Sequence, residues 1–289
     1  MRAAARRSRY SLPMDECRWP ALTAPILPAP DEVLLVSAAI DLPAARLAGL
    51  RATFSPHERK RDARFATSEL RDRWSAGRGL LRELLAAALG ADPARLKFRY
   101  GAHGKPELEP ASAPAPRDGG PPLTFNVSHS QGRALYALAR GREVGVDLEG
   151  IRERRSDGVA NRFFAPAESA ALRAIADEAD RRRAFFFVWS AKEAFIKATG
   201  AGLSQSMSSF VFELARVGAP PGSGPDEARS LLAPVAVRSH RDDAQAHQRW
   251  SVHPVSPAGG FSGALVAEGA VRVRLCAWDA AAVRMAAAE

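Results

Sequence analysis

FFFVWSAKEAFIKATGAGLS, residues 185–204, combines the pattern of a buried helix with a group of charged side chains. Its aromatic and aliphatic residues recur at helical spacing, and Gly200 is typical of a helix C-terminus. Glu193 and Lys197 are four positions apart and therefore share one face of such a helix, with Lys192 next to it. A surface ion pair between Glu193 and Lys197, worth about 0.3–0.5 kcal/mol, would explain this pattern. A functional interpretation therefore needs support from the rest of the chain.

The overall composition is that of an ordinary globular chain. Its 289 residues suffice for one large domain or two smaller ones, and 46% are hydrophobic and 25% charged. No run of eighteen apolar residues occurs, so we expect no membrane span, and the basic first residues lack the apolar core of a secretory signal. Cys17 and Cys276 lie far apart, which argues against a disulfide or zinc framework and favours a cytoplasmic location.

The chain carries a clear excess of positive charge. Lys and Arg total 41 against 32 Asp and Glu, for a formal net charge of +9. This excess favours a polyanionic partner, which could be a nucleic acid, a phosphorylated small molecule or an acidic protein. No nucleic-acid-binding motif is present and the aromatic residues have the spacing of a core, so we expect no nucleic acid partner.

Helical and strand patterns alternate along the chain and predict an α+β fold with antiparallel sheets. Residues 1–30 are rich in Pro, Ala and Arg and predict a flexible N-terminal extension. A first helix is expected to begin after Ser55, which is followed by a proline at the first helical position. A second helix is expected over residues 68–89, ending before Gly90.

Three strand-like runs follow in the middle of the chain, with the sequences LTFNVSHS, ALYALAR and EVGVDLE. Because only Gly141 and Arg142 separate the last two, the runs predict an antiparallel meander. Further helices are expected over about 166–176 and 180–199, and a polar insertion containing Pro and Gly over 216–247.

Asp147 and Glu149 are two positions apart on a predicted strand. Their carboxylates therefore project from one face, about 6.5–7 Å apart at the backbone. Two such carboxylates repel each other, and a divalent cation would remove that cost; Mg²⁺ prefers carboxylates, water and substrate phosphates as ligands. A solvated strand end is the alternative, and the pair alone does not decide between the two.

Polar residues near the end of the preceding strand suggest a phosphate site. FNVSHS contains Asn126, Ser128 and His129. A hydrolase triad is excluded because adjacent strand residues point to opposite faces and no G-x-S-x-G sequence surrounds Ser128. A hydroxyl and an imidazole at a strand end can instead bind a phosphate or cap a turn. Lys105, in the turn sequence GKP, carries a compact charge that is suited to phosphate.

Six segments, taken in order, resemble the 4'-phosphopantetheinyl transferases of the surfactin-synthetase-activating type. They are SPHERKRDARF, GRGLLRELLAAALG, GKPEL, FNVSHS, GVDLE and WSAKEAFIKATGAGLS. The resemblance extends from about residue 50 to residue 212, and its most specific part is the pattern W-S-x-K-E-x-x-x-K. Each segment alone is weak evidence, whereas six in the right order are hard to attribute to coincidence.

This resemblance implies a fold and a division of the chain. Two similar α/β halves with antiparallel sheets would pack around a pseudo-twofold axis within a single chain, with coenzyme A in the cleft between them. The N-terminal half would cover residues 31–142, and the C-terminal half, which carries the metal site, residues 143–289. Two halves in one chain would make a monomer sufficient.

The resemblance also assigns residues to the site. The carboxylates that match Asp147, Glu149 and Glu193 would hold Mg²⁺ against the pyrophosphate of coenzyme A, and Mn²⁺ is expected to substitute for it. Glu193 and Lys197 would be the catalytic residues. Coenzyme contacts are expected from Arg61, Arg73, Lys105, Pro106, Asn126, Ser128, His129, Lys192 and Lys197.

The reaction implied is transfer of phosphopantetheine from coenzyme A to a serine of an acyl or peptidyl carrier protein, with release of 3',5'-bisphosphoadenosine. Such carriers have an acidic surface and serve fatty acid, polyketide or nonribosomal peptide synthesis. Glu193 is expected to take the serine proton directly or through a metal-bound water, although a cation-bound glutamate has a lowered pKa and is a poor base. The alternative is a metal-dependent phosphohydrolase of a nucleotide-like substrate, with water as the nucleophile.

Overall fold

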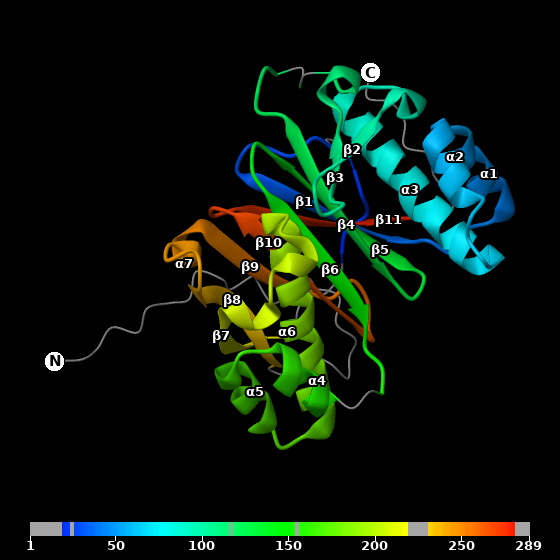
Figure 1. Ribbon diagram of the computed structural model, residues 1–289. Coiled ribbons are helices and arrows are strands. Elements are labelled where there is room, and N and C mark those ends of the chain that lie inside the picture. Colours follow the sequence, from blue (N-terminus) through cyan, green and yellow to red (C-terminus); the bar gives the residue numbers. More distant parts are fainter. Residues whose placement is uncertain are drawn as a thin grey trace.

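The computed structural model describes residues 19–23, 26–114, 116, 118–153, 156–218 and 231–280. It confirms an α+β fold with two main sheets, in which all strand pairs are antiparallel except one (Figure 1). No helix in these ranges is long and apolar enough to cross a bilayer.

The first sheet has the strand order β11-β1-β5-β4, and the pair of β1 with β11 is parallel. Its strands are β1 (Glu32–Ala39), β4 (Leu123–Ser130), β5 (Arg133–Arg140) and β11 (Arg272–Trp278). Helices α1 (Ala44–Ala52), α2 (Pro56–Asp62) and α3 (Ser68–Leu89) lie on one side of this sheet (Figure 1). A short hairpin of β2 (Phe98–Tyr100) and β3 (Pro106–Leu108) follows α3.

The second sheet has the strand order β6-β10-β9-β8-β7. Its strands are β6 (Val144–Gly150), β7 (Phe210–Val217), β8 (Leu231–His240), β9 (Trp250–Val255) and β10 (Phe261–Glu268). Helix α6 (Glu178–Thr199) packs against this sheet, and α4 (Ser156–Phe163) and α5 (Pro166–Arg173) lie beside its N-terminal part (Figure 1). Helix α7 (Ala246–Arg249) is a single turn between β8 and β9.

The predicted start of α2 and both predicted ends of α3 are confirmed, and the caps explain them. Ser55 and Glu58 form a reciprocal capping box at the start of α2. Helix α3 begins after Thr67, whose hydroxyl accepts the Leu70 amide, and ends at Gly90, whose φ of 63° is readily adopted only by glycine.

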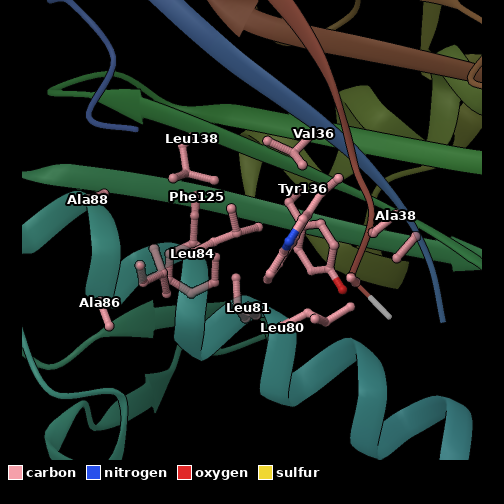
Figure 2. Packing of buried hydrophobic residues seen from close by; sticks show 14 of the residues in the cluster. Val36, Ala38, Leu80, Leu81, Leu84, Ala86, Ala88, Phe125, Tyr136 and Leu138 are labelled. Atoms are coloured by element: carbon pink, nitrogen blue, oxygen red, sulfur yellow. The ribbon is translucent and has the colours of Figure 1, made fainter. Parts of the chain in front are cut away.

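The core of the first half lies between α3 and the first sheet. Figure 2 shows Leu80, Leu81 and Leu84 of α3 close to the strand residues Tyr136 and Leu138. These side chains are almost completely buried, and each large aliphatic side chain that is removed from water contributes about 1.5–3 kcal/mol. Hydrophobic burial therefore fixes α3 and, through the α2–α3 connection, the basic residues that these helices carry.

The described N-terminal residues are part of the fold rather than a flexible extension. Ala21 forms a bridge with Ala277 of β11, and the indole of Trp19 is buried and donates to the Ser256 carbonyl at 3.0 Å. This differs from the expectation for residues 1–30, of which 1–18 lie outside the described part of the chain. Tertiary packing of one tryptophan outweighs a composition that is typical of a loop.

Two further expectations need correction. Strand β11 belongs to the first sheet, so a division into 31–142 and 143–289 does not coincide with the two sheets. The predicted insertion over 216–247 contains the whole of β8, a strand of the second sheet; residues 219–230 lie outside the described part.

The predicted meander is confirmed for β4 and β5 but wrong for β6. Strand β6 pairs with β10 in the second sheet, and side chains from β4 face the edge of β6 that a meander would have used. Three alternate residues in the C-terminal part of β4 accept backbone amides of β6. These bonds are Val146 N to Asn126 Oδ1 at 2.9 Å, Leu148 N to Ser128 Oγ at 3.3 Å and Gly150 N to Ser130 Oγ at 3.1 Å.

This row of side-chain bonds, which we call the β4–β6 seam, joins the two sheets. It satisfies backbone donors of β6 that would otherwise be buried without partners. Because the seam residues alternate along β4, they all lie on the face that meets β6. The seam therefore brings the FNVSHS and GVDLE segments together.

Candidate active site

Helix α6 packs directly against the backbone of β6 at Gly145. A Cβ atom at this position would lie 2.0 Å from the Ala194 carbonyl oxygen and 2.4 Å from the Ala198 amide nitrogen. Any other residue would therefore push the helix away from the strand. This contact places Glu193 and Lys197 of α6 on the same part of the molecule as the carboxylates of β6.

Lys197 forms its ion pair with Asp147, across the gap between helix and strand. Its ammonium donates to Asp147 Oδ1 at 2.7 Å, to Ser128 Oγ at 3.1 Å and to the Val146 carbonyl at 3.2 Å. The surface pair with Glu193 that helical spacing allows is therefore not the interaction that Lys197 makes. The side chain remains 30% exposed, so a substrate can reach it.

Three carboxylates influence one another at this site. Burial raises the pKa of Glu149, and the negative charges of Asp147 and Glu193 raise it further against the opposing effect of Arg152 and Lys197. Burial and Asp147 also raise the pKa of Glu193. The region thus holds more negative charge than its surroundings balance.

The donor set fits a hard cation such as Mg²⁺. Asp147 is only 5% exposed, and its Oδ2 atom is buried without a hydrogen-bond partner, which is costly unless a further group binds it. In the described part of the chain, no three Asp, Glu, His or Cys residues already surround a common point. Asp147, Glu149 and Glu193 would have to adjust to share an ion.

Ser128 and His129 come from the end of β4 beside this group. The Ser128 hydroxyl donates to Asp147 Oδ1 at 3.0 Å and accepts from Lys197, so it connects the strand acid with the helix lysine. His129 is exposed, and desolvation by the surrounding protein together with the Lys197 charge lowers its pKa. A neutral imidazole is therefore expected near pH 7.

Lys192 and Asn126 have structural roles, which corrects their sequence-based assignment to the coenzyme. Lys192 is 0% exposed, and its ammonium donates to the Met207 and Phe210 carbonyls at 2.8 Å each and pairs with Glu168 at 2.8 Å. It lies on the side of α6 that faces α5 and β7. Asn126 is buried in the seam.

Lys105 and Pro106 belong to the β2–β3 hairpin. Pro106 pairs with Tyr100. The Lys105 ammonium is bonded to Glu143 Oε2 at 2.6 Å and to two backbone carbonyl groups. The Lys105 ammonium therefore has its own three acceptors and contacts neither Asp147 nor Glu149.

The two arginines that are predicted to contact the coenzyme lie on α2 and α3, beside the first sheet. Arg61 of α2 is exposed and stacks over the Trp74 ring at 5.5 Å. Arg73 of α3 pairs with Asp41 and Glu69 at 2.6 Å each. Arg61 has a guanidinium that an anion can approach directly, whereas Arg73 would have to leave carboxylate partners.

Sequence reasoning missed Gly145 as a determinant of the site and Ser130 as a member of the seam. The signals were present: Gly145 interrupts a strand, which often marks close backbone approach, and Ser130 continues the alternation of Asn126 and Ser128. It also missed Glu168, because the resemblance assigns its partner Lys192 to the coenzyme.

A cavity of about 480 Å³ lies on another side of α6, near its C-terminus. Phe195, His240 and Trp250 are among its lining residues, and Glu143 is part of its wall. Asp147, Glu149, Glu193 and Lys197 do not line it. This cavity is therefore distinct from the candidate active site.

Comparisons with known proteins give a consistent picture. The family model of the 4'-phosphopantetheinyl transferase superfamily matches residues 143–251. The 4'-phosphopantetheinyl transferase HetI of Nostoc sp. (strain PCC 7120) is 42% identical over 176 residues, which are 61% of this chain and 71% of the relative. A 4'-phosphopantetheinyl transferase of Bacillus subtilis is 35% identical over 166 residues, 57% of this chain and 68% of the relative. Sfp of Bacillus subtilis (strain 168) is 30% identical over 161 residues, 55% of this chain and 66% of the relative.

Proposed function

This chain belongs to the 4'-phosphopantetheinyl transferase superfamily, and we propose that it is of the surfactin-synthetase-activating type and that its reaction depends on Mg²⁺. As a phosphopantetheinyl transferase it uses coenzyme A as substrate and modifies carrier proteins. The observation that carries the proposal is the group of Asp147, Glu193 and Lys197, with Asp147 Oδ2 buried and lacking a partner.

We assign the metal to Asp147, Glu149 and Glu193, with Mn²⁺ as a substitute. A bound Mg²⁺ would neutralise charge on the pyrophosphate of coenzyme A. The same ion would remove the repulsion that raises the pKa of Glu149 and Glu193. The backbone contact of α6 with β6 at Gly145 supports this assignment, because it holds the helix that carries Glu193 against the strand that carries the other two acids.

Lys197 and Ser128 are placed to contact the phosphate groups. The Lys197 side chain is partly exposed, and its ammonium would stabilise the negative charge that develops on the reacting phosphoryl group. Ser128 Oγ, bonded to both Lys197 and Asp147, would hold this lysine in position. His129 and the exposed Arg61 are proposed to bind the 3'-phosphate, with Arg73 nearby.

The reaction joins the serine Oγ of the carrier to the phosphorus that bears pantetheine, and it breaks the bond from this phosphorus to the bridging oxygen. The leaving group is 3',5'-bisphosphoadenosine. Glu193 is the proposed acceptor of the serine proton, because its raised pKa makes it a stronger base than an ordinary carboxylate. Binding of a cation would oppose this rise, so a water molecule that passes the proton on is the second route.

The carrier is proposed to be an acyl or peptidyl carrier protein with an acidic surface, met in the cytoplasm by a monomeric enzyme. The net charge of +9 favours such an encounter. We therefore expect kcat/KM for the carrier to fall as salt rises, since ions screen charges beyond about 8 Å at physiological strength. Kinetics across a salt series test this, and a flat response would indicate an apolar docking surface.

Intact-mass analysis tests the proposed reaction. A panel of apo carrier proteins from fatty acid, polyketide and nonribosomal peptide synthesis is incubated with the enzyme, coenzyme A and Mg²⁺. The expected result is the mass gain of one phosphopantetheine on at least one carrier. Release of free phosphopantetheine with no modified carrier would contradict the proposal and indicate a phosphohydrolase.

A further inference from the structure

Lys105 reaches from the β2–β3 hairpin to the second sheet. Its ammonium donates to Glu143 Oε2 at 2.6 Å, to the Ala198 carbonyl at 3.2 Å and to the Val144 carbonyl at 3.3 Å. An ammonium group has three N–H donors, and each of these acceptors can take one. The Lys105 side chain is 14% exposed, so the group is largely enclosed.

The two carbonyl groups identify what this lysine connects. Ala198 is in the last turn of α6, where carbonyl groups lack partners within the helix. Val144 is the first residue of β6. One ammonium therefore joins the end of the helix that carries Glu193 and Lys197 to the start of the strand that carries the two acids. A positive charge at the C-terminus of a helix is also favourable for the helix dipole.

A second contact holds the hairpin at the same place. Gly202, just beyond α6, has a φ of 57°, and a Cβ atom built on it would lie 2.5 Å from the Cβ of His103. The turn that precedes Lys105 therefore packs directly on the loop that follows the helix. The position of Lys105 is fixed from both sides.

We propose that Lys105 and Glu143 form a clamp that positions α6 against β6, and that Lys105 is a positioning residue rather than a ligand of the coenzyme phosphates. The proposal rests on the proposed transferase function. Glu143 holds the ammonium over the two carbonyl groups, and the ammonium sets the spacing of the helix and strand. Loss of the clamp lets the last turn of α6 move, so Lys197 and Glu193 meet the substrate less often in the correct geometry.

The test compares Lys105→Met, Glu143→Gln and the double variant. We expect kcat to fall about tenfold for Lys105→Met and about two- to threefold for Glu143→Gln, which leaves the carbonyl contacts, while KM for coenzyme A changes less than about twofold. The double variant should be no slower than Lys105→Met, because both changes act on one interaction. If Lys105 instead binds phosphate, Lys105→Met raises KM for coenzyme A and Glu143→Gln has no effect on kcat; that result would overturn the proposal.

The matched control is the ion pair between Arg99 and Glu107 on the same hairpin, whose atoms lie 2.8 Å apart at the surface. Glu107→Gln should leave kcat and KM unchanged. Hydrogen exchange provides a readout that needs no activity: Lys105→Met should speed exchange of amides in the last turn of α6, and Glu107→Gln should not. Unchanged exchange in Lys105→Met would refute the clamp. A wild-type enzyme that modifies no carrier would refute the proposed function while leaving the exchange result valid.

Discussion

Lys192 and Lys197 lie five positions apart on α6, and each contacts a carboxylate, yet their surroundings differ. Lys192 is fully buried, and its carboxylate partner Glu168 also accepts two backbone amides, from Ala165 at 3.0 Å and from Phe212 at 2.8 Å. Lys197 is partly exposed, and its partner Asp147 keeps one buried oxygen without a hydrogen bond. The closed, satisfied ion pair thus anchors the helix, whereas the incomplete one marks the side that receives ligands.

We expect the greatest loss of activity at the Asp147–Lys197 pair, on the side of α6 that is proposed to receive ligands. Asp147→Asn keeps an oxygen for Lys197 and Ser128, but it places an amide where a cation would bind. We expect transfer activity to fall by about three orders of magnitude, as for loss of a main electrostatic contribution to catalysis, with little change in melting temperature. Steady-state kinetics and calorimetry measure the two effects. Full activity in this variant, or in wild-type enzyme with excess chelator, would show that the metal assignment is wrong.

The second prediction is a loss of stability at the buried Lys192–Glu168 pair, on the opposite side of α6. Lys192→Met leaves Glu168 buried without its counterion, and the Met207 and Phe210 carbonyls lose their donor. Breaking such a buried pair costs about 3–5 kcal/mol of unfolding free energy. Urea unfolding measures this cost, with Glu168→Gln and the double variant as controls. The double variant should lose less than the sum of the single changes. A loss below about 1 kcal/mol would mean that this pair does not anchor the helix.

The smallest effect is a gain in stability. Because the folded-state pKa of Glu193 is raised above its usual 4.5, the stability it contributes is present at low pH and is lost as pH rises through the folded-state pKa. Glu193→Gln removes that loss. We expect the metal-free variant to melt about 1–3 °C higher than the metal-free wild type at pH 7, with a smaller difference toward pH 4.5.

Mg²⁺ should reverse this order. The ion stabilises the wild type more than the variant, because the wild type keeps all three proposed carboxylate ligands. Melting curves at several pH values, with and without Mg²⁺, measure both differences. A variant that is less stable than the wild type at pH 7 without metal would contradict the raised pKa.

Local signals in the sequence were sufficient for part of this picture. Ser55 and Gly90 predicted helix ends, and the spacing of Asp147 and Glu149 placed their carboxylates on one strand face. These features depend on neighbours within a few residues, which caps and strand periodicity encode directly.

Long-range contacts could not be predicted in this way. Helical spacing puts Lys192 close to Glu193 and Lys197, but only the packing of α5 and β7 decides that it is buried. Similarly, the turn position of Lys105 does not show that its side chain crosses to the second sheet. The sequence predicts β6 beside its neighbour β5, because consecutive strands usually pair, whereas in the structure β6 pairs with the distant β10.

The roles of the two sides of α6 are tested most directly by the single-turnover rate of phosphopantetheine transfer to an apo carrier protein, measured for the Lys197→Ala and Lys192→Met variants. Both are measured with saturating coenzyme A at a temperature where circular dichroism shows each variant to be folded. We predict that Lys197→Ala slows transfer by about a hundredfold, whereas folded Lys192→Met stays within about threefold of the wild type. Slow transfer by the Lys192→Met variant together with a wild-type rate for Lys197→Ala would contradict the assignment of anchoring to Lys192 and catalysis to Lys197.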